Sequence, residues 1–491
     1  MQFHEPRTRA VLAALALGAT AVVARAQTAA TKATDKIPIT TSSEDARQLY
    51  LQGRDLAEKL RATDARRFYE LALAKDQGFA LAQVGLANTA GNAKEFFDAV
   101  GKAKALAGRV TEPERLLITS MEAGGNGEVA KQKDALLKLV RDYPNDERGH
   151  NLLAGFYFGQ QDYPAAIDEY KKATTINPSF SQPYNQLGYA YRFQERYPEA
   201  EQAFRKYIEL IPGDPNPYDS YAEFLMKVGR FDESIQSYEK ALAIDKNFIA
   251  SYIGIANDQM FQGKGEAARQ TLSRLTAVAR NSGEKRLALF WTAQSYVHEA
   301  ATDKAVAEAK KMAAIAEGEK DLAGLAGDDN LMANILLEAG RVDEAALLYA
   351  KRLETIDKAD VPAQVKEATH RNALFDQARV ALAKKDLATA KARTDEYAKQ
   401  VAAKGIPNEL RQQHELRARL ALEAKDYATA AVELEKAGTQ DPRVFYLLGL
   451  ARKGEGDAPK AKAALTKAAN WNALSPNLAY VRTKAKEAAG S

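Results

Sequence analysis

A spacing of 34 residues recurs through the middle of the chain and constrains its fold more than any other feature. Prolines keep this spacing at Pro144, Pro178 and Pro212. Columns of mostly small residues and a column of large apolar residues follow the same register. The columns are Ser120, Ala154, Gly188, Ala222, Ala256; Gln132, Ala166, Ala200, Ser234, Ala268; and Leu136, Tyr170, Phe204, Tyr238, Leu272. Several independent columns in one register indicate an internal repeat, in which each unit is one supersecondary element.

Residues 181–214 show what one unit is. Apolar residues recur there at three and four positions, which is the spacing of one helical face, at Tyr184, Leu187 and Tyr191. Gly188 lies on that face, where a bulky side chain would hold a neighbouring helix away. Pro198 suits the first turn of a second helix, because its missing N–H is not needed there. Each helix pair leaves an apolar edge that only another pair covers. The sequence therefore predicts an all-α superhelical solenoid of stacked antiparallel helix pairs.

The columns resemble the tetratricopeptide repeat (TPR) family, and the resemblance is best over 113–282. It implies a superhelix in which the first helix of each pair lines a concave surface. Aligned on the alanine and aromatic columns, a regular TPR array covers 46–282. Its expected units are 46–79, 80–112, 113–146, 147–180, 181–214, 215–248 and 249–282.

The step loosens beyond residue 282, which predicts degenerate TPR-like helical repeats over 283–476. The small residue that opens the second helix of each pair falls at Ala268, Ala305, Ala345, Ala390, Ala430 and Ala461. We expect about twelve pairs in total, with longer connections around 283–285, 320–325, 360–370 and 405–410. A C-terminal capping helix and tail are expected over 477–491, because the open end of a solenoid needs a polar cover. The pattern leaves open whether the array is one continuous spiral or is divided near residue 283.

The first 26 residues have the three parts of a secretory signal peptide. Arg7 and Arg9 precede an apolar stretch, Ala10–Ala24, and a small-residue exit follows at Ala26. The apolar run is about 15 residues long, whereas a membrane-spanning helix needs roughly 20. We therefore predict export, to a bacterial periplasm or by secretion, with no transmembrane segment in the mature chain. An uncleaved anchor or an ordinary first helix is the alternative. Residues 27–45 are expected to form a flexible lead.

Composition and motifs exclude several classes of function. The chain has no cysteine, which removes disulfides, thiolate metal sites and cysteine nucleophiles. Its formal charge is +4, and the signal segment holds three arginines against one glutamate, so the near-neutral remainder makes nucleic acid an unexpected partner. His298 and His414 each precede a glutamate, as in zinc proteases, but Thr302 and Ala418 replace the second histidine. No metal, no cofactor and no catalytic residue is predicted.

A strip of polar and aromatic residues is the candidate binding site. Asn185, Tyr189 and Arg192 are spaced to share one face of the first helix in their unit. By the resemblance, that helix lines the concave surface. Positions in neighbouring units complete the strip, namely Asn151, Asp219, Glu223, Lys227 and Asn257. Asparagine amides bind peptide backbones, and Arg192 or Lys227 could bind a carboxylate. The two acidic residues argue against the carboxylate clamp of some TPR relatives. The alternative is an inner surface that is merely solvated.

The sequence favours an exported, non-enzymatic scaffold that binds proteins or peptides through its concave face in the cell envelope. Stacked repeats offer a long preformed surface, which lowers the ordering cost of binding an extended segment. A second hypothesis is an accessory protein that binds a polysaccharide or cell-wall polymer during envelope biogenesis or export. In that case Tyr189 would stack on sugar rings. A third hypothesis is an enzyme with an unrecognised site. The sequence does not identify the partner.

Overall fold

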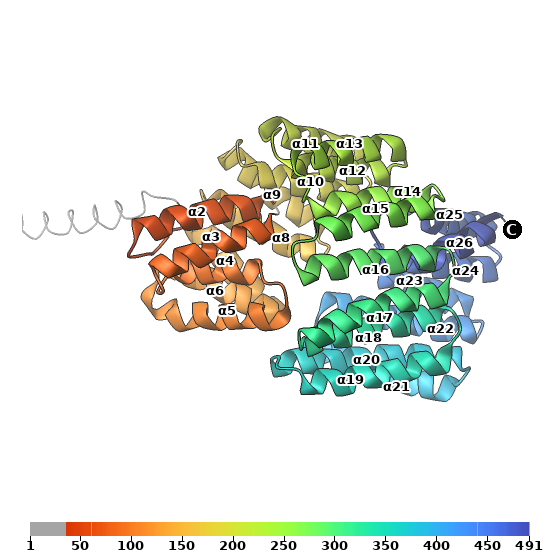
Figure 1. The fold of residues 1–491 in the computed structure, drawn as a ribbon. Helices are drawn as coiled ribbons and strands as arrows, with labels where there is room; N and C mark the ends of the chain where they lie inside the picture. The colour runs from red at the N-terminus through yellow and green to blue at the C-terminus, as the bar shows by residue number, and fades with distance from the viewer. Residues whose placement is uncertain (1–35, 60, 439, 491) are drawn as a thin grey trace, which may run out of the picture.

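A regular array of short helices forms the first part of the chain. The computed structural model describes residues 36–59, 61–438 and 440–490, and within these ranges every regular element is helical, which confirms the predicted all-α class (Figure 1). Seven antiparallel pairs come first: α2 (Glu44–Glu58) with α3 (Ala62–Lys75), α4 (Ala80–Asn88) with α5 (Ala93–Leu106), α6 (Glu112–Gly125) with α7 (Val129–Asp142), α8 (Glu147–Gly159) with α9 (Tyr163–Ile176), α10 (Ser181–Phe193) with α11 (Tyr197–Leu210), α12 (Pro215–Lys227) with α13 (Phe231–Ile244), and α14 (Ile249–Phe261) with α15 (Gly265–Val278). A short 3-10 helix, Ala107–Arg109, follows α5.

Longer helices form the rest of the described chain. They are α16 (Ser282–His298) with α17 (Thr302–Gly318), α18 (Leu322–Glu338) with α19 (Val342–Lys358), α20 (Ala363–Ala383) with α21 (Leu387–Lys404), α22 (Pro407–Glu423) with α23 (Tyr427–Ala437), α24 (Pro442–Gly454) with α25 (Ala458–Ala469), and a final α26 (Pro476–Gly490). The expected longer connections are wrong, because the extra residues lengthen the helices. Helix α20 has 21 residues and α21 has 18, against 14 in α11. Helices α15 and α16 pack together across the predicted boundary near residue 283.

The repeat columns become the contacts inside each helix pair. Gly188 on α10 faces Phe204 on α11, and a Cβ at Gly188 would lie 2.6 Å from the phenyl ring. Gly254, which lies outside these columns, makes a similar close approach between neighbouring pairs, from α14 to Tyr238 on α13. Alanines of the second column are fully buried, at Ala166, Ala200 and Ala268. Small residues therefore let the helices approach, and the aromatic rings fill the space between them.

The turn between paired helices also repeats every 34 residues. At the same place in five successive units the backbone takes the left-handed conformation, with φ of 71°, 63°, 59°, 81° and 78° at Gly127, Gln161, Glu195, Gly229 and Gly263. Two of these residues are not glycine, and for them this conformation costs about 1–2 kcal/mol. The left-handed conformation therefore repeats every 34 residues although the residue type at this position does not, so the sequence does not reveal it.

An N-terminal strap, residues 36–43, crosses the ends of the first inner helices. Thr40 donates hydrogen bonds from its backbone N and its Oγ1 to the carboxylate of Glu114, at 2.7 and 2.6 Å. Other contacts are Ile37 N with Asp146 Oδ2 (2.7 Å) and Thr41 Oγ1 with Asp76 Oδ2 (2.6 Å). This part of the expected flexible lead, 27–45, is therefore held in place. The predicted signal peptide lies outside the described residues.

The superhelix returns on itself, so that α24–α26 lie against α12, α14 and α16 (Figure 1). One hydrophobic cluster joins the two regions, with Phe445, Trp471 and Leu478 on one side and Ile253 and Trp291 on the other. We call this contact the closing seam. The predicted capping helix exists as α26, but it packs against α16 as well as against α25. It therefore closes the superhelix in addition to covering its last pair.

Candidate binding surface on the inner face

The eight predicted residues lie on the inner helices α8, α10, α12 and α14, and most of them contact other parts of the chain. Asn185 is 1% exposed, and Asn257, Arg192 and Asp219 are also buried. The other four residues, Asn151, Tyr189, Glu223 and Lys227, are partly exposed. Along α10, α12 and α14 the strip is therefore largely enclosed by the chain itself. Their binding role stays a prediction.

Arg192 is held by its own chain. Its Nη1 lies 3.2 Å from Glu223 Oε2 on the next inner helix, and its guanidinium lies 4.7 Å from the centre of the Tyr189 ring. The carboxylate that Arg192 was expected to bind in a partner is therefore supplied by Glu223. Because the guanidinium covers one face of Tyr189, and the edge of that ring meets Phe204, Tyr189 is not free to stack on a sugar. The main residue of the polysaccharide hypothesis is thus occupied.

Lys227 belongs to the closing seam. Its Nζ donates a hydrogen bond to the Trp471 carbonyl at 2.9 Å and lies 3.8 Å from the centre of the indole ring. Burial, reinforced by the nearby charge of Arg192, lowers the pKa of Lys227 to about 8. Lys227 is therefore engaged by its own chain in this structure, and its contact with a partner's carboxylate stays a prediction. Sequence reasoning missed Trp471, whose signal is modest: it is one of two tryptophans and follows the last regular helix pair.

Buried acids line the inner face behind the seam. Burial, with a further contribution from Glu223, raises the pKa of Asp219 to about 8, and Ser251 Oγ donates a hydrogen bond to Asp219 Oδ1 at 2.7 Å. Asn257 Nδ2 donates to the Ile253 carbonyl at 2.9 Å. Asp258, which sequence reasoning missed, is fully buried, and burial raises its pKa to about 8 as well. These groups form a polar layer of the core because the helices packed around them exclude water.

The accessible part of the strip lies on α8. Asn151 is half-buried and donates from Nδ2 to Gln182 Oε1 at 3.0 Å. Leu152 is 43% exposed, and Gly155 on the next turn is also exposed. An apolar side chain beside small, open positions is suited to contact with a partner's side chains. Of the eight predicted residues, Asn151 is the one that this patch contains.

Nothing in the described residues groups three or more His, Asp or Glu side chains around a common metal position. His414 Nδ1 lies 2.7 Å from Glu433 Oε2, and His150 Nδ1 lies 2.6 Å from Glu169 Oε2. These two histidines are thus bound to carboxylates on paired helices. Across the same ranges, every helix is too short or too polar to cross a bilayer.

Comparison with known proteins bears on the repeats. A TPR repeat family model matches residues 156–194, and two tetratricopeptide repeat models match 181–214 and 225–289. No curated protein matches the chain. Among solved structures, the crystal structure of MamA protein is similar, with 20% identity over 34% of this chain and 91% of that one, at a TM-score of 0.29.

Two other solved structures are similar over part of the chain. YrrB, described as a TPR protein with an unusual peptide-binding site, has 17% identity over 37% of this chain and 93% of its own, at a TM-score of 0.26. PilW, described as a widely conserved type IV pilus biogenesis factor, has 20% identity over 44% and 95%, at a TM-score of 0.33. The assignment rests on the repeat matches, the 34-residue columns and the stacked pairs. Together they show that the chain carries tetratricopeptide repeats, which the family models match over residues 156–214 and 225–289.

Proposed function

We propose that the chain is an exported, non-enzymatic scaffold of the cell envelope that binds another protein through the open inner face at α8. The observation that carries the proposal is the closing seam, in which the inner face of α12, α14 and α16 buries apolar side chains of α24–α26. The inner surface of this array thus already binds a helical segment, and that segment belongs to the same chain. Helix-in-groove contact of this kind is also how separate partners are recognised.

The patch on α8 is the continuation of that surface beyond the seam. Asn151, Leu152 and Gly155 occupy the inner helix of the fourth unit, and Leu152 provides its exposed apolar side chain. A preformed helical surface lowers the ordering cost of binding. A partner that places an apolar side chain against Leu152 and a backbone polar group against Asn151 would use both features.

Export is supported by the order of Arg7, Arg9, the apolar stretch Ala10–Ala24 and the small-residue exit at Ala26. Expression of the full chain in a bacterial host, followed by cell fractionation and N-terminal sequencing, tests this part. We expect a periplasmic or secreted product that begins near Gln27. A cytoplasmic product that retains Met1 would contradict export and leave the binding proposal standing on its own evidence.

Partner binding is tested by a photo-crosslinking amino acid placed at Leu152. The matched control places it at Leu347 on α19, which is 73% exposed and far along the chain from the patch. We expect specific crosslinked protein from envelope extract with the first probe and none with the second. Leu152→Arg should then abolish capture, whereas Leu347→Arg should leave it unchanged. Equal crosslinking at both positions, or capture that survives Leu152→Arg, would contradict the assignment.

A further inference from the structure

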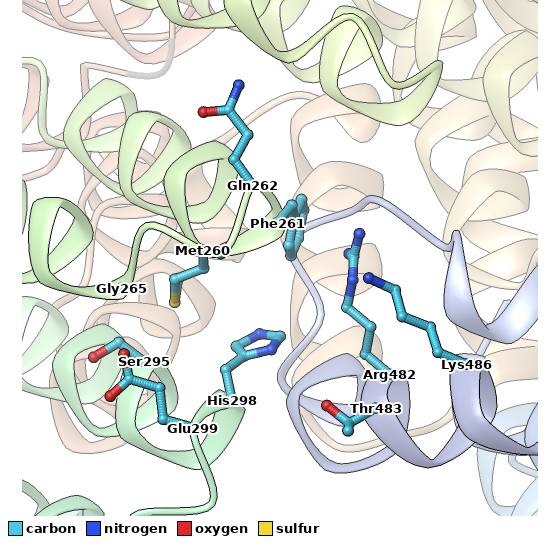
Figure 2. A pocket seen from close by; sticks show the side chains of 11 residues that line it. Met260, Phe261, Gln262, Gly265, Ser295, His298, Glu299, Arg482, Thr483 and Lys486 are labelled. Atoms are coloured by element: carbon cyan, nitrogen blue, oxygen red, sulfur yellow. The ribbon is translucent and has the colours of Figure 1, made fainter.

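A pocket of about 290 Å³ lies at the closing seam, where α14, α15, α16 and α26 meet. Figure 2 shows the side chains around it. Phe261 forms an apolar wall at the end of α14, and His298 projects from the end of α16. Arg482 and Lys486 project from α26 into the same space, one helical turn apart. The pocket therefore lies between the basic face of α26 and the end of α14 in the array.

Arg482 differs from the other buried arginines of the described chain. Arg192, Arg371 and Arg379 are each paired with a carboxylate, at 3.2 Å from Glu223, 2.7 Å from Glu409 and 3.0 Å from Glu338. Arg482 is only 8% exposed, yet among the described residues no carboxylate lies within ion-pair distance of it, and its Nη1 has no hydrogen-bond partner. Its guanidinium lies 4.6 Å from the centre of the Phe261 ring. A buried charge without a counter-charge is costly, and this one points into the pocket.

The other charged groups around the pocket do not neutralise Arg482. Lys486 adds a second positive charge, and its own pKa is lowered by burial and then by Arg482. Glu299 is the acid in the lining, but its carboxylate lies 3.0 Å from Arg269 Nη1. Burial, with Arg482 and Lys486 adding to it, lowers the pKa of His298 to about 4, so this ring is neutral near pH 7 and retains an N–H donor.

We propose that the seam pocket binds a small oxyanion, a carboxylate or a phosphate group, which Arg482 and Lys486 hold and to which His298 donates a hydrogen bond. Arginine suits this role because its planar guanidinium donates two parallel N–H groups to a carboxylate or phosphate. Bound there, the anion would supply the missing counter-charge for both cations at once.

The size of the pocket limits the ligand. Ligand sites usually have volumes of about 300–1,000 Å³, so this one is at the lower end. It suits a small organic acid, a phosphate ester or one acidic group of a larger molecule. Since the pocket lies between α16 and α26, its occupant would also strengthen the closing seam. This inference does not depend on the α8 patch.

Thermal unfolding and calorimetric titration with inorganic phosphate and with succinate test the site, with sodium chloride at equal ionic strength as the reference. We expect a saturable rise in Tm and measurable binding heat with one or both anions. The anion that binds more tightly shows whether the site prefers a phosphate group or a carboxylate. Arg482→Met keeps much of the apolar stem against Phe261 and should weaken binding at least tenfold. Lys486→Met should weaken it about three- to tenfold.

Lys484→Met is the matched control, because Lys484 lies on the same helix but points toward Glu338, at 3.7 Å. It should change anion affinity less than twofold. The His298 imidazole resonances of labelled protein should shift with added anion in the parent chain and not in Arg482→Met. If that variant does not fold, Lys486→Met and the His298 shifts decide. No saturable response beyond chloride in the parent chain, or equal affinity in the Lys486 and Lys484 variants, would overturn the proposal.

Discussion

Two buried acids of the regular array, α2–α15, and two glutamates of the longer helices, α16–α26, are accommodated in opposite ways. In the array, Asp219 and Asp258 are buried, and burial raises the pKa of each to about 8. In the second region, Glu338 lies 3.0 Å from Arg379 Nη2, and Arg419 Nη2 lies 2.8 Å from Glu415. The comparison shows that one superhelix accommodates buried acids by protonation at Asp219 and Asp258 and by ion pairing at Glu338 and Glu415.

The ion pairs of the second region converge on Glu338 and Glu415. Arg443 connects them, with Nη1 at 4.0 Å from Glu338 and Nε at 3.5 Å from Glu415. Burial alone would raise the pKa of both glutamates, but the surrounding arginines outweigh it and lower both values. Because these residues come from α18, α22 and α24, the cluster ties three inner helices together.

Removing Arg443 should produce the largest effect and tests whether ion pairing stabilises the second region. Arg443→Met removes the cation that buried Glu415 shares with partly buried Glu338 and Asp441, and we expect a loss of about 3–5 kcal/mol in the free energy of unfolding. Urea denaturation measures the loss, and hydrogen exchange should locate it in α18–α26. Arg341→Met is the control, because Arg341 pairs with exposed acids and should cost no more than about 1 kcal/mol. Equal effects of the two substitutions would remove the distinction between the regions.

A smaller effect tests the close helix packing of the array. A Cβ added at Gly254 would overlap the ring of Tyr238, which is fully buried. We expect Gly254→Ala to destabilise the protein by about 1–3 kcal/mol. Gly101 on α5 has no neighbouring atom within 4 Å of an added Cβ, so Gly101→Ala should instead stabilise by about 0.5–1 kcal/mol. Chemical denaturation of both variants measures the two changes in the free energy of unfolding, which should have opposite signs. A stabilising Gly254→Ala would show that the close approach of α14 to Tyr238 does not need a glycine at this position.

The pH dependence of stability sharpens the comparison further. Because the pKa of Asp258 is about 8 in the folded chain and about 4 when unfolded, the folded chain retains a proton between these pH values that the unfolded chain has released. The protonated Asp258 carboxyl therefore contributes fully to stability below about pH 4, and this contribution is lost as the pH rises through 8. We expect the free energy of unfolding to fall by up to about 1.4 kcal/mol per pH unit over that window for this group.

Asp258→Asn should flatten that slope, as measured by urea denaturation at several pH values. Exposed Asp168 on α9 provides the control, and Asp168→Asn should leave the slope unchanged. Glu338 and Glu415 have the opposite sign, because their pKa values are lowered on folding. Their contribution is present above the unfolded value and is lost as the pH falls through the folded values. A slope that Asp258→Asn does not alter would show that this carboxyl is ionised in the folded protein.

The repeat columns predicted the helix pairs because they record contacts between neighbours in sequence. Gly188 against Phe204 and the buried alanines are contacts of that kind. The longer helices beyond residue 282 were not predicted, since a wider step between Ala305, Ala345 and Ala390 fits either a longer loop or a longer helix. The closing seam was also not predictable, because the contact of Lys227 with Trp471 depends on small rotations accumulated over many pairs.

The sequence predicted where the residues of the candidate site lie, but it did not predict which of them are accessible. Helical spacing placed Asn185, Tyr189 and Arg192 on one inner face, and the structure keeps them on one helix. It could not show that Glu223 and α24–α26 already occupy that face. The sequence also contained no sign that Arg482 is buried and unpaired, because a basic residue in a final helix is ordinarily solvated.

The contact between α16 and α26 also limits how this chain can change in length. Open repeat arrays tolerate the gain or loss of whole units, since each unit contacts only its neighbours. Here an extra pair inserted between α17 and α25 would carry α26 away from its position beside α16 and expose Trp471 and Leu478. The number of pairs in this stretch is therefore set by geometry, and duplication of one unit would open the molecule instead of extending it.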